Sequence, residues 1–112
     1  MTSRERQARR AFSTLGEQRV LAFLRAVRND GSCKAVGFVN EHLDNGEALE
    51  DIFFDGDEFG YRMSVKTRGP HLFEVEFGCS PGPLVGDGGM WEVEFDEVGA
   101  VAHVTATGFW IS

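Results

Sequence analysis

The residues best suited to chemistry in this sequence lie in its last segment, where a histidine and two threonines alternate with apolar residues. His103, Thr105 and Thr107 occupy every second position, the spacing that puts side chains on one face of a β-strand. Tyr61 and Trp91 occupy odd positions in earlier runs of the same kind, so we expect all five side chains on one inward face. Together they would line the mouth of a small ligand pocket.

Two interpretations of this group stay open. The free pKa of histidine is near neutrality, so His103 would be able to exchange a proton with a bound apolar metabolite, with Tyr61 as its partner. Alternatively, His103 is a core or rim histidine bonded to a backbone carbonyl, and the threonines are present because β-branched residues suit strands. We favour the second interpretation, because no motif in reach supplies a second catalytic group.

An alternation of apolar and polar residues must position this group. It predicts strands at about 59–67, 71–79, 90–96 and 100–111, each buried on one side. Between the second and third strands, the glycine-rich segment 78–89 is expected to be a flexible hairpin loop. The apolar odd positions are Phe59, Tyr61, Met63, Val65, Phe73, Val75, Phe77, Cys79, Trp91, Val93 and Phe95.

The fourth strand breaks this alternation if its odd positions face inward. Its even positions then put Val104 and Trp110 on the outer face, where the neighbouring strand carries Glu92 and Glu94. Exposed apolar groups on an edge strand indicate a contact surface. We give equal weight to a helical segment that folds over them. If the surface is open, a homodimer through this sheet is expected.

Helices are expected before the strands. Apolar residues at helical spacing predict a helix at about 15–28, which Thr14 and Glu17 would begin with a capping box. Similar spacing predicts helices at about 32–43 and 48–56, and a short strand at 52–54 competes with the latter. The apolar stripe of the first helix consists of Val20, Phe23, Leu24 and Val27.

This order of elements predicts an α+β fold, with N-terminal helices packed on one face of a four-stranded antiparallel meander sheet. The architecture is similar to the cone-like cystatin and NTF2 folds, a likeness of element order that implies no function. We expect a single domain over residues 1–112, composed of a basic helical segment 1–30, an acidic helical segment 31–56 and the sheet 57–112.

The net charge of −7 conceals an uneven distribution. Residues 1–30 hold seven arginines against three acids, and the remainder holds four cations against fifteen acids. We expect the basic helix to lie on the acidic sheet of its own chain, and no nucleic-acid partner, because the net charge repels phosphate. The acidic stretch 41–58 leaves open a basic protein partner, such as a toxin or nuclease that this chain would inhibit, although we favour a solvated surface.

Neither a cofactor, a metal nor a membrane is expected. The chain has no secretory signal and no apolar run of roughly 20 residues, so we expect a soluble cytoplasmic protein. These features favour a small binding or protein-interaction module, and the alternative is a small enzyme that uses His103. No metal-binding spacing relates Cys33, Cys79, His42, His71 and His103.

Overall fold

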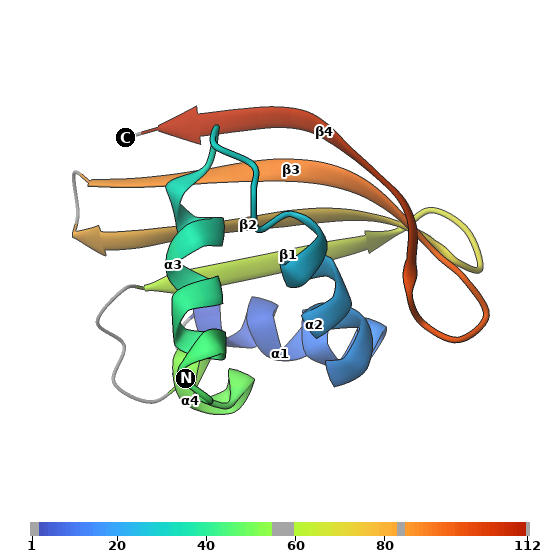
Figure 1. The fold of residues 1–112 in the computed structure, drawn as a ribbon, viewed down its shortest axis with the longest axis horizontal. Coiled ribbons are helices and arrows are strands. Elements are labelled where there is room, and N and C mark those ends of the chain that lie inside the picture. The colour runs from blue at the N-terminus through green and yellow to red at the C-terminus, as the bar shows by residue number, and fades with distance from the viewer. Residues whose placement is uncertain (1–2, 55–59, 83–84, 112) are drawn as a thin grey trace.

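In the computed structural model, which describes residues 3–54, 60–82 and 85–111, the helices cover one face of a single four-stranded sheet (Figure 1). The sheet is an antiparallel meander with the strand order β1-β2-β3-β4, which confirms the expected α+β fold class. The elements are α1 (Ser3–Leu15), α2 (Glu17–Ala26), α3 (Lys34–Asp44), α4 (Leu49–Phe54), β1 (Tyr61–Thr67), β2 (Leu72–Gly82), β3 (Val85–Phe95) and β4 (Val101–Ile111).

The predicted helix at about 15–28 is present as α2, and a separate helix, α1, precedes it and meets it at Gly16. The backbone of Gly16 has a φ of 85°, a conformation that glycine adopts without the steric cost paid by other residues. Thr14 is therefore part of α1, and α2 begins without a side-chain cap, so the expected capping box is wrong. The later helices are present with shifted ends, and residues 52–54 belong to α4 rather than to a strand.

The core lies between the helices and the inner face of β1, β2 and β3. The odd positions of these strands are buried as predicted, apart from the half-buried Val65, while Phe59 lies outside the described residues. The ring of Phe23 on α2 meets that of Trp91 edge to face at 5.5 Å between centroids, an arrangement that aromatic pairs prefer. Helix residues that complete the core include Val20, Leu24, Val36, Val39 and Phe53.

The described parts of the glycine-rich segment, residues 78–82 and 85–89, belong to β2 and β3, where a flexible loop was expected. The ladder between β2 and β3 extends to the pair Gly82 and Val85. Gly78 and Gly88 face each other across it, and the indole of Trp110 lies over both. A Cβ on Gly88 would lie 2.4 Å from Cε2 of that indole. The glycines therefore make room for a large ring on the outer face.

Two β-bulges in β4 overturn the expected orientation of the side chains between them, whereas Val101, Phe109 and Ile111 keep the expected inward orientation. Phe95 pairs with Val101, but the next pair joins Glu94 to His103, so one residue of β4 is extra, and a second shift lies between Met90 and Trp91. Each bulge turns the following residues to the other face of the sheet. The positions of β4 that pair with inward residues of β3 are Val101, Val104, Ala106, Phe109 and Ile111.

Among the described residues, arginines of the N-terminal segment pair with acids of α3 and α4, whereas an acidic sheet was the expected contact. Arg25 and Arg28 both bond Asp44, at 2.6 and 2.9 Å. Arg9 lies 3.6 Å from Glu50. The acidic stretch is thus partly matched by arginines of its own chain, and its last acids lie outside the described residues.

No helix in the described part of the chain is both long enough and apolar enough to cross a membrane.

Candidate functional site

The structure separates the five residues that were expected to share a pocket. Tyr61 and Trp91 are buried in the core, with 2% and 1% of their surface exposed. His103 pairs with Glu94 and its side chain is 81% exposed, with Nε2 4.0 Å from a Glu94 carboxylate oxygen. The expected pocket and the pairing of His103 with Tyr61 are wrong, because the bulges of β4 put His103 on the opposite face of the sheet.

The two threonines are exposed as well. Thr105 pairs with Glu92 on the outer face. Thr107 lies at the second bulge, where its hydroxyl donates to the carbonyl of Met90 at 3.2 Å. Its observed role is thus to support the irregular strand.

Of the two residues expected in an outer contact stripe, only Trp110 lies on the outer face. Val104 pairs with Val93 and packs against the core, so its expected orientation is wrong. Trp110 lies over the glycines, and the guanidinium of Arg62 is 5.8 Å from its ring centroid.

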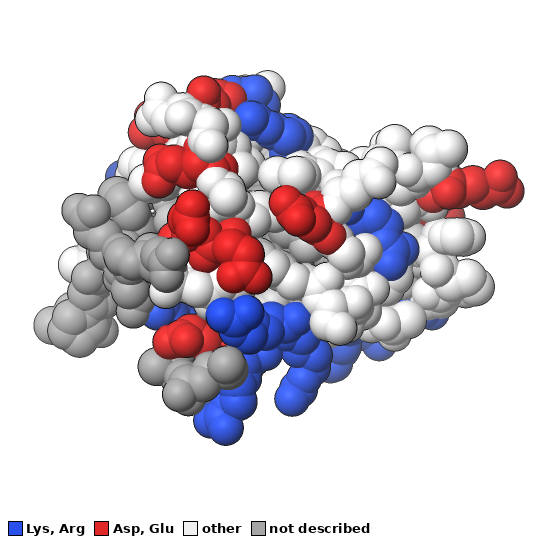
Figure 2. Space-filling model, turned by 90° about the horizontal axis from the view of Figure 1, so that it is seen from below, with Lys and Arg blue, Asp and Glu red and all other residues white. Residues whose placement is uncertain are grey.

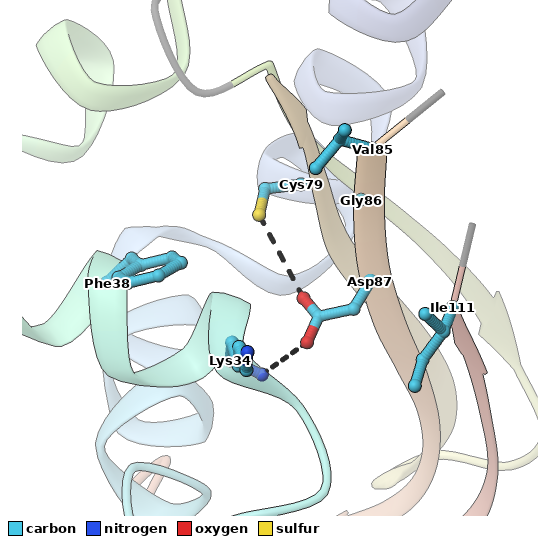
Figure 3. Close-up of a pocket in the computed structure, with 7 residues that line it drawn as sticks. All are labelled: Lys34, Phe38, Cys79, Val85, Gly86, Asp87 and Ile111. Atoms are coloured by element: carbon cyan, nitrogen blue, oxygen red, sulfur yellow. Dashed lines mark hydrogen bonds between the residues drawn. The ribbon is translucent and has the colours of Figure 1, made fainter. Parts of the chain in front are cut away.

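A different candidate site lies at the corner where α3 begins and β4 ends (Figure 3). It is a hollow of about 210 Å³. Phe38 approaches it from α3, while Val85 and Ile111 approach it from the strands (Figure 3). Cys79 and Asp87 form its floor. The hollow therefore has apolar walls above two polar groups.

The carboxylate of Asp87 is bound by the chain itself. Its two oxygens accept the backbone N–H groups of Lys34 and Ala35, the latter at 3.1 Å, and the thiol of Cys79 lies 4.0 Å away. Since Cys33 provides no side-chain cap for α3, Asp87 caps this helix from the neighbouring strand. The charge of Asp87 is thus matched by the positive end of α3.

The cysteines beside this carboxylate are not activated nucleophiles. Burial raises the pKa of the Cys33 thiol to about 11, and the charge of Asp87 raises it as well. Burial and Asp87 also raise the pKa of Cys79. Because the thiolate is the reactive form, both thiols are neutral near pH 7. Among the described residues, no group of side chains is arranged to hold a metal ion.

Exposed large apolar residues gather around the hollow. Val85 is 61% exposed and Ile111 is 83% exposed. Phe109 is two residues before Ile111 on the same face of β4, and it is 42% exposed. We call Phe38, Val85, Phe109 and Ile111 the apolar corner. The only exposed large apolar residue outside it in the described part of the chain is Val98.

The size of the hollow limits what it binds. Pockets for small-molecule ligands typically measure about 300–1,000 Å³, and this one is smaller. Its volume suits amino-acid side chains better than a metabolite. It also adjoins β4, the outermost strand of the described sheet, whose free edge has backbone groups available for pairing. No pattern in the sequence indicates this site, because the position of α3 over the strand ends is a tertiary feature.

Comparisons with protein families, with curated proteins and with solved structures found no match to this chain.

Proposed function

We propose that this protein is a small interaction module that forms a homodimer through the apolar corner and the adjoining end of β4. The observation that supports this proposal is the clustering of exposed apolar side chains beside a free strand edge. Contiguous exposed apolar patches mark interaction sites, whereas single exposed apolar residues are ordinary.

The end of β4 is suited to pairing with the same segment of a second copy. After the bulge at Thr107, residues 108–111 pair regularly with β3. A two-fold axis perpendicular to the sheet at Trp110 would put Phe109 of one copy opposite Ile111 of the other. Paired residues share a face in an antiparallel sheet, so both apolar pairs would lie on the helix-covered side. The contact would cover the most exposed residues of the apolar corner.

The composition of β4 favours a second copy as the partner. Edge strands are commonly protected from pairing by Lys, Pro or inward charges, and β4 contains no Lys, Arg, Asp, Glu or Pro. A two-fold contact must be complementary to itself, and apolar groups satisfy this condition without like-charge repulsion. Among the described residues that line the hollow, Asp87 is the one acid, and α3 already binds it.

The contact is short, so the dimer should be weak. Four residues of strand and four apolar side chains form less than a standard interface of about 800 Å² per partner. We therefore expect dissociation constants in the micromolar range, which corresponds to about −8 kcal/mol.

Light scattering coupled to size exclusion tests the dimer across a range from roughly micromolar to millimolar protein. The wild-type mass should rise toward twice that of the chain, and Ile111→Asp should stay monomeric throughout. Val98→Asp is the matched control, because Val98 is also largely exposed, at 75%, and lies outside the apolar corner. A wild type that is monomeric at every concentration, or a Val98→Asp variant that dissociates equally, would overturn the proposal.

A further inference from the structure

A second surface feature lies along β1 and does not involve the apolar corner. Three hollows of about 280, 140 and 110 Å³ all include Ser64 in their lining. Arg62 and Lys66 are the neighbours of Ser64 on the same face of β1, each about 7 Å away along the strand. From α1, Arg10 and Gln7 line the hollow on the other side of Ser64. Residues of α1 and β1 thus line hollows that share the hydroxyl of Ser64.

Positive charge exceeds negative charge around Ser64. In the described part of the chain, no carboxylate lies within salt-bridge distance of Arg10, Arg62 or Lys66. Two acids also line these hollows. Glu74 is already bonded to Arg68, and the other, Glu76, accepts a hydrogen bond from the Ser64 hydroxyl at 3.4 Å. Each of the three hollows that share Ser64 therefore has one cation in its lining, Lys66, Arg62 or Arg10, and Gln7 lines the two that contain the arginines.

The same imbalance is visible at a larger scale. Figure 2 shows a group of Lys and Arg side chains along the lower edge of the view, with Asp and Glu side chains bordering it. Arg6, Arg9 and Arg10 of α1 are all exposed. A chain with a net charge of −7 thus has a local surface of the opposite sign.

We propose that the hollow around Ser64 binds the oxyanion group of a small ligand, either a phosphate ester or a carboxylate. Guanidinium groups bind such oxyanions through paired hydrogen bonds. The ammonium of Lys66, the hydroxyl of Ser64 and the amide of Gln7 provide further donors. The bond from Ser64 to Glu76 is long, so little is lost when the hydroxyl turns to a ligand.

A small anion fits this surface better than a nucleic acid. The hollows are small, and Glu76 lies on β2 directly beside Ser64, with Glu92 on the next strand. The net charge would repel an extended polyanion, while screening at physiological salt confines the attraction to about 8 Å. Because Arg62 and Lys66 are about 13 Å apart along β1, the site acts on a small ligand that directly reaches the cations nearest Ser64 and Gln7.

Inorganic phosphate and citrate are the probes for a test by NMR titration at low ionic strength. Saturable shifts are expected in the backbone amides near Gln7, Arg10 and Ser64. Arg10→Gln and Arg62→Gln should each weaken binding by about tenfold, the effect of losing one hydrogen bond to a charged group. Glu76→Gln should tighten binding, because it removes the opposing carboxylate.

The control variant is Lys34→Gln, which removes an exposed cation at the apolar corner and should leave the titration unchanged. Stronger binding of phosphate would identify phosphate esters as the ligand class, and stronger binding of citrate would identify carboxylates. The proposal fails if neither probe saturates, or if Lys34→Gln weakens binding as much as Arg62→Gln does. The spectrum of each free variant verifies its fold, since Arg10, Lys34 and Arg62 are exposed and Glu76 is half-buried.

Discussion

Asp87 shows how one side chain can join two elements that are distant in sequence. It lies on β3, yet its carboxylate accepts the first backbone amides of α3, more than fifty residues earlier in the chain. A helix leaves its first four N–H groups without intrahelical partners. The position of α3 on the sheet, and with it the shape of the hollow, therefore depends on this carboxylate.

Replacement of Asp87 by alanine should lower the free energy of unfolding by about 1–2 kcal/mol, because two amides at the start of α3 lose their acceptor. Urea denaturation measures this loss. Asp87→Asn keeps one acceptor oxygen and should lose less stability. Equal stability of the alanine variant and the wild type would show that solvent satisfies these amides equally well.

Because the thiols are buried, we predict that the free energy of unfolding depends on pH in the alkaline range. The pKa of Cys33 is 9.0 when unperturbed and about 11 in the folded protein. Between these values the unfolded chain releases the proton and the folded chain retains it, so the free energy of unfolding should fall as the pH rises. Below pH 9 this contribution is constant.

Cys33→Ala isolates the effect of this thiol, because it removes one titrating group and leaves the others in place. The difference in unfolding free energy between wild type and variant, measured from pH 8 to pH 11, should change only above pH 9.0, the unperturbed value. A constant difference over this range would mean that the thiol titrates alike in both states.

At the scale of elements, the packing of the Trp110 indole on the outer face of β2 and β3 requires glycine beneath it. A methyl group on Gly88 would collide with the Trp110 indole, and such overpacking typically costs about 1–3 kcal/mol. Gly88→Ala should therefore destabilise the protein. In the double variant with Trp110→Ala, the combined loss should be smaller than the sum of the single losses, since the collision disappears.

At Gly37 we predict the opposite effect of an alanine substitution on stability. It lies inside α3, and a Cβ added there would meet nothing within 4 Å. Gly37→Ala should raise stability by about 0.5–1 kcal/mol, the usual gain when alanine replaces glycine in a helix. Thermal denaturation of Gly88→Ala and Gly37→Ala under the same conditions measures both effects. A lower midpoint for Gly88→Ala indicates a steric requirement for glycine, and a higher midpoint for Gly37→Ala indicates that glycine there only adds backbone flexibility to the unfolded chain.

At the scale of the whole molecule, dimerisation couples stability to concentration. A partner that binds only the folded state raises the midpoint of thermal unfolding as its concentration rises. The wild-type midpoint should thus increase with protein concentration, and that of Ile111→Asp should not. If both midpoints are independent of concentration, the apolar corner does not associate in the folded protein.

Much of the fold was predictable from the sequence, because its cause is local. Period-two alternation identified the inner face from Tyr61 to Phe95, and helical spacing identified α2 and α3. The turn before β4 contains Gly99 at a φ of 88°. These features follow from the period of each element and from the preference of glycine for positive φ.

Tertiary structure alone decided the orientation of β4 and the location of the candidate sites. A bulge shifts every following residue to the other face, and its presence depends on pairing with β3, which the sequence of β4 does not reveal. The same is true of Asp87 beside α3 and of Arg10 beside Ser64. In each case the contact joins segments far apart in the chain, so only the packing of the helices on the sheet creates it.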